Sequence, residues 1–251
     1  MMYARPRKPA AAGRFYPNDE EALGEMVRDY LVSPASRLER RPRAVIAPHA
    51  GYVYSGAIAG QAFGTVEPWA DEIERVVLIG PSHFAPVASL VVDGHARFET
   101  PLGEVPVDAE AVEALVGEGA VEVAEEPHRR EHSLETHLPF LQELLGGFEI
   151  VPIVTGRGDG RQVAEVIDRL LADDRTLISV SSDLSHYHDY ESARAIDAQT
   201  RQAIEALDPE GFEDEQACGH TAIRGILRVA RRDGWSVETL DMCNSGDTAG
   251  D

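Results

Sequence analysis

Short apolar runs alternate with longer amphipathic segments along this chain, and that alternation constrains the fold more than any other feature. The runs are typical of buried strands, and the amphipathic segments are typical of helices. Strands separated by helices need crossover connections, which favour a mostly parallel sheet with helices on its faces. The expected strands are residues 43–48, 75–80, 148–156, 175–183 and 235–243, and the expected helices are 18–33, 55–66, 109–119, 133–147, 159–174, 190–209 and 220–234.

The chain is predicted to form one α/β domain spanning residues 1–251. It contains no internal repeat and no linker, and its length suits a single core. Residues 88–108 alternate in polarity around Asp93-Gly94, which predicts a β-hairpin that turns at this dipeptide. His95 and His128 are expected to lie in solvated loops.

Three of the expected strands end just before a histidine. His49 follows the first strand, His83 follows the second, and Asp183 and His186 follow the fourth. The carboxyl ends of parallel strands meet at one edge of a sheet and form its binding crevice. A single histidine after a strand often only caps a helix or bonds a carbonyl. Three in the same relative position predict a shared site.

Two further stretches carry candidate ligands. Cys218 directly precedes a helix, and a helix N-terminus favours the thiolate form that binds metals, although a small buried residue is an equally good interpretation. His132 and His137 are five residues apart, ~140° around a helix, so they do not form a zinc-binding pair on one face. Either histidine could reach the pocket.

The donor types indicate a metal site. Imidazole suits iron, copper and zinc, and thiolate favours soft Cu(I), zinc or iron. Two histidines with a carboxylate would instead indicate a non-haem Fe(II) site. An unligated His186 would titrate near neutrality as a general base, and Asp183 could orient it or complete the coordination.

Composition limits the partners. The chain has 44 acidic and 23 basic residues, a formal net charge of −21, which disfavours nucleic acids and anionic membranes. The longest apolar runs are too short to span a bilayer, and the first residues lack a signal-peptide core. Two cysteines do not make a disulfide framework. A cytoplasmic location is expected.

Several motifs together resemble the Memo-like family, also called protein B of the AmmeMemoRadiSam system. They are AAGRFYP, AVIAPHAGYVYSG, VVLIGPSHF, EHSLETHLPF, SVSSDLSHY, ACGHTAI and NSGDTAGD, in this order over essentially the whole chain. The resemblance implies a fold akin to the class III extradiol (LigB-type) dioxygenases. It also implies that family members usually continue past the last motif with one more strand.

The resemblance assigns roles to individual residues. His49 and His83 correspond to the metal-binding histidines, and Cys218 stands where the dioxygenases have a carboxylate. His186 corresponds to the base beside the metal, with Asp183 next to it. The pocket-lining candidates are Phe15, Tyr16, Tyr52, Tyr54, His132 and His137.

The implied function is metal binding with a redox role. The expected cofactor is a single Fe(II) or Cu ion, with zinc less favoured, acting in a small-molecule redox step of undefined substrate. The alternatives are a non-catalytic module that binds a small molecule or peptide in a vestigial site, and a protein that stores or delivers metal. The resemblance also suggests a pathway link to radical-SAM and AMMECR-type proteins.

Overall fold

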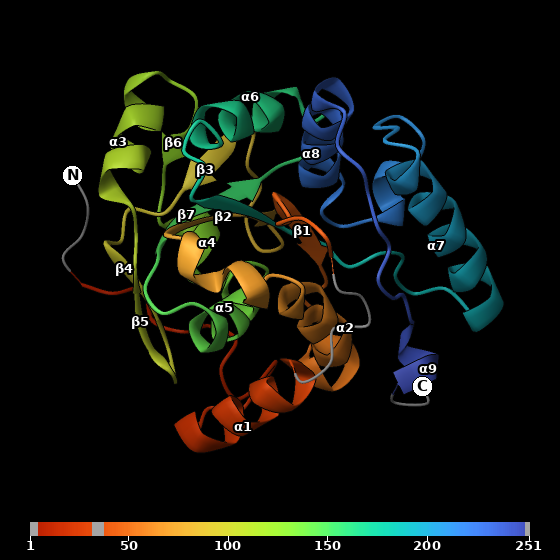
Figure 1. Ribbon diagram of the computed structural model, residues 1–251, viewed down its shortest axis with the longest axis horizontal. Coiled ribbons are helices and arrows are strands. Elements are labelled where there is room, and N and C mark those ends of the chain that lie inside the picture. The colour runs from red at the N-terminus through yellow and green to blue at the C-terminus, as the bar shows by residue number, and fades with distance from the viewer. Residues whose placement is uncertain (1–4, 32–37, 249–251) are drawn as a thin grey trace.

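The computed structural model describes residues 5–31 and 38–248. Its centre is a six-stranded sheet in the order β1-β8-β2-β7-β3-β6, in which β3 runs antiparallel to β7 and the other pairings are parallel (Figure 1). The strands are β1 (Ala44–Ala47), β2 (Arg75–Pro81), β3 (Leu90–Val92), β6 (Glu122–Val123), β7 (Glu149–Thr155) and β8 (Thr176–Ser181). The expected α/β class with a mostly parallel sheet is confirmed.

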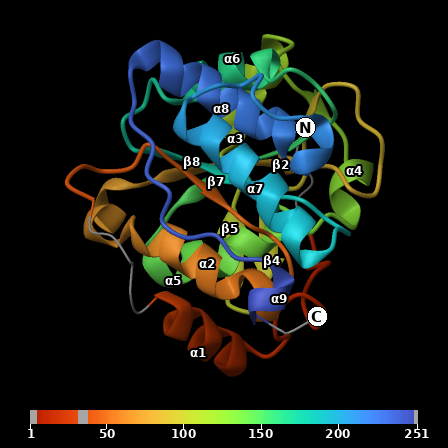
Figure 2. The ribbon, with the colours of Figure 1, turned by 90° about the vertical axis from the view of Figure 1, so that its right-hand side faces the viewer.

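Helices cover both faces of this sheet. The helices α6 (Arg161–Leu170) and α8 (His220–Asp233) lie side by side on one face, and α2 (Tyr52–Gly64) and α5 (Leu138–Leu144) lie on the other (Figures 1 and 2). This cover explains why β2 and β7 read as nearly continuous apolar runs, since strands buried on both faces have no solvent side. The remaining helical segments are α1 (Glu20–Leu31), η1 (Glu67–Glu72), α3 (Ala109–Gly117), α4 (Glu126–Arg129), η2 (Glu135–His137), α7 (Tyr190–Glu205), η3 (Asp214–Gln216) and α9 (Ser245–Thr248).

Helix α1 packs closely on α2 because α2 has small residues at the contact. A Cβ atom added to Gly60 would lie 2.4 Å from the carbonyl oxygen of Tyr30, and one added to Gly56 would lie 2.3 Å from the Tyr30 ring. The Tyr30 hydroxyl donates to the carbonyl of Tyr52 at 3.1 Å. Helix α2 begins at Tyr52, three residues earlier than expected. Residues 32 and 33 of the first expected helix lie outside the described residues.

The expected hairpin at Asp93-Gly94 is wrong. The observed hairpin joins β4 (Arg97–Thr100) to β5 (Gly103–Pro106), while β3 belongs to the main sheet. Asp93 is fully buried, and its carboxylate accepts from the backbone N–H of His95 at 3.0 Å and lies 2.6 Å from His95 Nδ1. The chain bend at this position is therefore held by a buried polar contact between Asp93 and His95, and it is not a solvated turn. His95 and His128 are buried, contrary to expectation.

The expected last strand, residues 235–243, is irregular and runs from α8 toward α9 (Figure 2). Trp235 and Leu240 pack partly against the core, but Val237 is exposed. The alternating pattern therefore has no continuous buried face, and within residues 38–248 this segment pairs with no strand. The question of a further strand after residue 248 lies outside the described residues.

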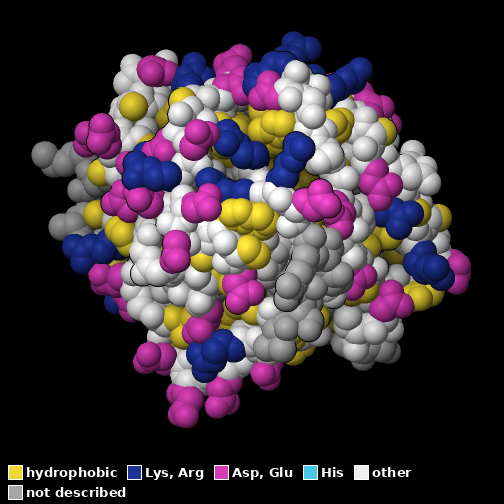
Figure 3. All heavy atoms as spheres, in the orientation of Figure 1, with side chains coloured by type: hydrophobic (Ala, Val, Ile, Leu, Met, Phe, Trp, Pro, Cys, Tyr) yellow, Lys and Arg dark blue, Asp and Glu magenta, His cyan; other side chains and the backbone are white. Residues whose placement is uncertain are grey.

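The surface matches the composition. Acidic side chains are scattered over the face in Figure 3, with arginines between them. In residues 5–31 and 38–248, no helix has the length and apolar character needed to cross a bilayer. Both cysteines, Cys218 and Cys243, are free thiols.

Candidate metal centre

Three adjacent strands bring the candidate side chains to one edge of the sheet. Strands β1, β8 and β2 are parallel neighbours, with Ala47 paired to Ser181 and Ile79 paired to Val180. His49, Asp183 and His83 each lie two residues beyond the end of one of these strands. The carboxyl-edge position expected from the sequence is therefore observed.

Three imidazoles gather at this edge. The ring centroids of His49 and His83 are 5.1 Å apart, those of His49 and His132 are 5.4 Å apart, and those of His83 and His132 are 4.7 Å apart. One ring nitrogen from each lies within 4.8 Å of the other two. Nitrogens bound to one ion at about 2.0–2.1 Å lie roughly 3–4 Å apart. Small side-chain movements would therefore let all three contact one ion.

Hydrogen bonds determine which nitrogen each histidine presents. The Ser181 hydroxyl donates to the Ser133 carbonyl at 2.6 Å, so it must accept from Nδ1–H of His49 at 2.7 Å. His83 Nδ1 lies 2.8 Å from a Glu131 carboxylate oxygen, which only accepts. Both histidines consequently keep a lone pair on Nε2. Ligating histidines usually donate their other ring N–H in this way.

Glu131 organises the loop that carries His132. It is buried and accepts from the backbone N–H groups of His83, His132 and Ser133 at 2.6–2.9 Å. Burial alone would raise the pKa of Glu131, but its contacts with His83 and Ser133 outweigh burial and lower this pKa to about 2. Glu131 is thus ionised. No sequence pattern singles out Glu131, although it directly precedes His132 in the EHSLETHLPF motif.

His132 has a ring nitrogen that is available to bind a metal. Its Nδ1 is buried and makes no hydrogen bond with any described residue, although a Glu131 carboxylate oxygen lies 3.4 Å from it. The Phe15 ring lies 4.2 Å from the His132 ring, centroid to centroid. Burial lowers the pKa of both His132 and His49 to about 4. These two imidazoles are therefore neutral at pH 7, which is the form that binds metals.

Asp183 and Cys218 lie beside the cluster. One Asp183 oxygen accepts from the backbone N–H groups of His49 and Ala50 at 2.7 and 3.1 Å, and the other lies 3.8 Å from His49 Nε2. The Cys218 sulfur lies 3.3 Å from the same Nε2. Burial, followed by the charge of Asp183, raises the pKa of Cys218 to about 12. The thiolate expected from the helix N-terminus is therefore wrong for the metal-free protein.

The remaining pocket-lining candidates make contacts of their own. Tyr16 and Tyr52 are buried, and their hydroxyls donate to the Glu135 carboxylate at 2.6 Å and the Thr136 carbonyl at 2.7 Å. His137 is buried with Nδ1 2.9 Å from the Ser179 hydroxyl and Nε2 3.2 Å from the Pro48 carbonyl, so both its nitrogens are engaged. Tyr54, in the first turn of α2, is 38% exposed.

His186 is not gathered into the cluster. Its side chain is exposed in the loop that follows Asp183, and it makes no hydrogen bond within the described part of the chain. Its positive form contributes to lowering the pKa of Asp183, although burial acts the other way and His49 has the larger lowering effect. His188 is exposed as well.

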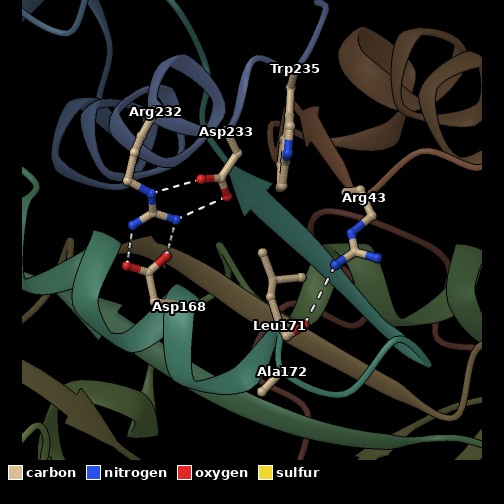
Figure 4. A pocket seen from close by; sticks show the side chains of 7 residues that line it. All are labelled: Arg43, Asp168, Leu171, Ala172, Arg232, Asp233 and Trp235. Carbon is tan, nitrogen blue, oxygen red and sulfur yellow. Dashed lines mark hydrogen bonds and ion pairs between the residues drawn. The ribbon is translucent and has the colours of Figure 1, made fainter.

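A separate cavity of about 410 Å³ lies at the opposite, amino end of the strands (Figure 4). Arg232 spans it between the carboxylates of Asp168 and Asp233, and Trp235 stands beside Arg43, the residue before β1. Arg43 pairs with Asp174 at 2.9 Å. The charged groups that line this cavity are therefore already engaged in ion pairs.

Fold and site together define a single-domain α/β protein with a histidine-rich cluster at the carboxyl ends of parallel strands. The chain belongs to the Memo-like protein family, whose model matches residues 7–251. A MEMO1 family protein of Archaeoglobus fulgidus is 36% identical over 97% of this chain and 94% of its own length. One of Methanosarcina acetivorans is 37% identical, and Ta0237 of Thermoplasma acidophilum is 34% identical, each over 98% of this chain and 94% of the relative.

Proposed function

We propose that this protein binds one redox-active metal ion, Fe(II) or Cu, through His49, His83 and Cys218, and uses it in a small-molecule redox step. The observation that carries the proposal is the convergence of three imidazoles, two of which, His49 and His83, have Nδ1 already engaged by Ser181 and Glu131. Such an ion supplies electron transfer and an open position for a substrate. A kinship with the extradiol dioxygenase fold, which we also propose, supports a mononuclear site.

The charge balance of the site supports a bound cation. Asp183 and Glu131 both have a lowered pKa and together supply two negative charges beside the imidazoles. Buried charges of one sign are costly unless they are compensated. Mixed imidazole and sulfur donors suit iron and copper, and the distant origin of the ligands argues against a structural zinc site.

Cys218 would act as a ligand only after losing its proton. Its sulfur is close enough to His49 to share an ion with it, and metal binding would drive the deprotonation. Asp183 would hold the loop of His49 in place through its two backbone hydrogen bonds. In the catalytic version of the proposal, His186 is the acid–base group at the open side of the site.

The proposal is tested by metal content and titration. Protein purified without oxygen or chelators should hold about one iron or copper per chain, and apo protein should take up Fe(II) or Cu(I) at the same ratio. His49→Ala, His83→Ala and Cys218→Ala should each lower the affinity at least tenfold, whereas His188→Ala, an exposed histidine outside the cluster, should leave it unchanged. Refusal of both ions by the folded wild-type protein would refute the proposal.

Metal storage without catalysis is the second candidate. It is favoured by the exposed position of His186, which makes no hydrogen bond with the described residues. His186→Ala separates the two, because storage would be unaffected while turnover of any substrate would be abolished. A binding module that uses a vestigial site would instead refuse metal altogether.

A further inference from the structure

A buried arginine near the start of the chain contacts the segment that carries Glu131 and His132. The Arg7 side chain is only 4% exposed. Its backbone is fixed beside β4, because the Arg7 N–H donates to the Arg97 carbonyl at 2.8 Å and the Arg7 carbonyl accepts from the Glu99 N–H at 2.9 Å. The guanidinium group therefore enters the interior from a fixed piece of backbone.

The Arg7 guanidinium spans the segment of residues 128–135. Its Nε and one Nη donate to the His128 carbonyl at 2.9 and 2.7 Å, and the same Nη also donates to the Glu131 carbonyl. The other Nη donates to the Glu135 carboxylate at 2.7 Å. One planar group thus binds three acceptors that lie 121–128 positions away in the chain. A lysine ammonium cannot reproduce this fork of donors.

Glu135 holds the N-terminal segment in return. Its side chain is fully buried, and every hydrogen bond that its carboxylate accepts from the described residues comes from residues 7–16. Besides the guanidinium, the donors are the backbone N–H groups of Ala10 and Ala11, both at 2.8 Å, and the Tyr16 hydroxyl at 2.6 Å. Buried charges are costly unless they are paired and hydrogen-bonded, and here both conditions are met. The two segments therefore fix each other in one relative position.

These contacts lie one step from the candidate ligands. Glu131, whose carbonyl accepts from Arg7, binds His83 through its carboxylate, at 2.8 Å from Nδ1 and 2.6 Å from the backbone nitrogen. On the N-terminal side, the Phe15 ring lies 4.2 Å from the His132 ring. Loss of the Arg7 contacts would therefore free Glu131 to move, and with it the nitrogen that His83 presents to the cluster.

We infer that Arg7 is a positioning residue for the histidine cluster, which holds the Glu131 backbone so that the Glu131 carboxylate keeps His83 oriented. Arg7 acts through this backbone and not at the ion. Its consequence for metal binding rests on the proposed function, whereas the order of the 128–135 segment can be measured without metal. An arginine that only stabilised the fold would affect the whole domain equally.

The first measurement is hydrogen exchange of backbone amides in the metal-free protein. Arg7→Lys keeps a positive charge beside Glu135, so the buried carboxylate is not left unpaired and the domain folds. It loses the fork of bonds to the two carbonyls. Exchange at His132 and Ser133 should therefore rise at least tenfold relative to exchange at Val77, a core residue of β2.

Two controls separate positioning from stability. Gly60→Ala disturbs the packing of α1 on α2, so it lowers stability without touching the 128–135 segment and should not raise this ratio. Arg28→Lys is the matched substitution, at an exposed ion pair with Glu143, and should leave all rates unchanged. A ratio in Arg7→Lys no higher than that in Gly60→Ala would overturn the inference, because Arg7 would then only stabilise the fold.

The second measurement is the affinity for Fe(II), by competition with a chromophoric chelator. Arg7→Lys should weaken binding about 10–100-fold, as loss of an outer partner of a ligating histidine does, whereas both control variants should match wild type. Unchanged affinity despite a loosened segment would also overturn the inference. Refusal of Fe(II) and Cu(I) by the wild type, with the exchange result as expected, would refute only the proposed function and would still support the hold of Arg7 on the segment.

Discussion

The Nδ1 nitrogen of His83 lies 2.8 Å from a carboxylate oxygen of Glu131, a residue 48 positions away in the chain. This contact directs the His83 Nε2 lone pair toward the cluster, and Glu131 also holds the backbone of His83 through a 2.6 Å hydrogen bond. One buried carboxylate thus sets both the tautomer and the position of a candidate ligand.

Glu131→Gln should therefore weaken metal binding by about 10–100-fold, the usual cost of losing a partner of a ligating histidine. The amide cannot accept as strongly from Nδ1–H and has no charge to offset the cation. Competition with a chromophoric chelator measures the effect. Glu126→Gln is the control, since its ion pair with Arg129 is exposed. Equal affinities for the two variants would remove Glu131 from the site.

The role of Cys218 has a distinct pH signature. Because the pKa of this thiol is raised to about 12, thiolate ligation at neutral pH must release one proton. The logarithm of the metal association constant should then rise by about one per pH unit between pH 6 and 8. His49 and His132, with pKa values of about 4, contribute nothing in that range.

Cys218→Ser should remove this slope if the sulfur is a ligand. A wild-type protein with no more slope than the serine variant would instead favour His132 as the third ligand, through its Nδ1, which makes no hydrogen bond in the described part of the chain. Potentiometric measurement during titration with the metal gives an independent count of the protons released for each ion bound.

The positions of the strands and of the clustered histidines follow from local patterns, which is why they were predictable. An apolar run such as residues 75–80 indicates by its composition that it is buried. In a parallel sheet the carboxyl ends of the strands meet at one edge, which is a general property of such sheets. Hence His49, His83 and Asp183 could be placed together from the sequence, whereas the hairpin turn and the strand at 235–243 could not. Those two depend on what the segment packs against.

The contacts that complete the site are long-range and have no local signal. Ser181 bonds His49 across 132 positions, and the inward direction of Glu131 depends on β2 lying nearby. The same reason explains His128, expected in solvent from its acidic surroundings. It is buried, with Nε2 3.0 Å from the carbonyl of Val91 in β3.

The buried His128 makes the fold sensitive to acid. Burial lowers its pKa to about 4, whereas the unfolded chain has a value near 6.5, so between these pH values the unfolded state binds more protons and stability falls as pH falls. Its contribution to the loss between pH 7 and 5 is about 2 kcal/mol. Urea unfolding of metal-free protein at both pH values should show that His128→Gln has a smaller loss than wild type. His188→Gln, an exposed control, should lose as much as wild type.

The packing of helix α1 against helix α2 should be disturbed when Gly60 gains a side chain. A Cβ there would lie 2.4 Å from the Tyr30 carbonyl oxygen, a backbone atom that can move only with its helix. We expect Gly60→Ala to lower the free energy of unfolding by about 1–3 kcal/mol, the usual range for overpacking. Gly117→Ala is the matched control, because a Cβ at that position, the last residue of α3, meets no atom within 4 Å. It should be neutral or slightly stabilising. If Gly60→Ala is as neutral as this control, helix α2 can move away from α1 and the overpacking argument is wrong.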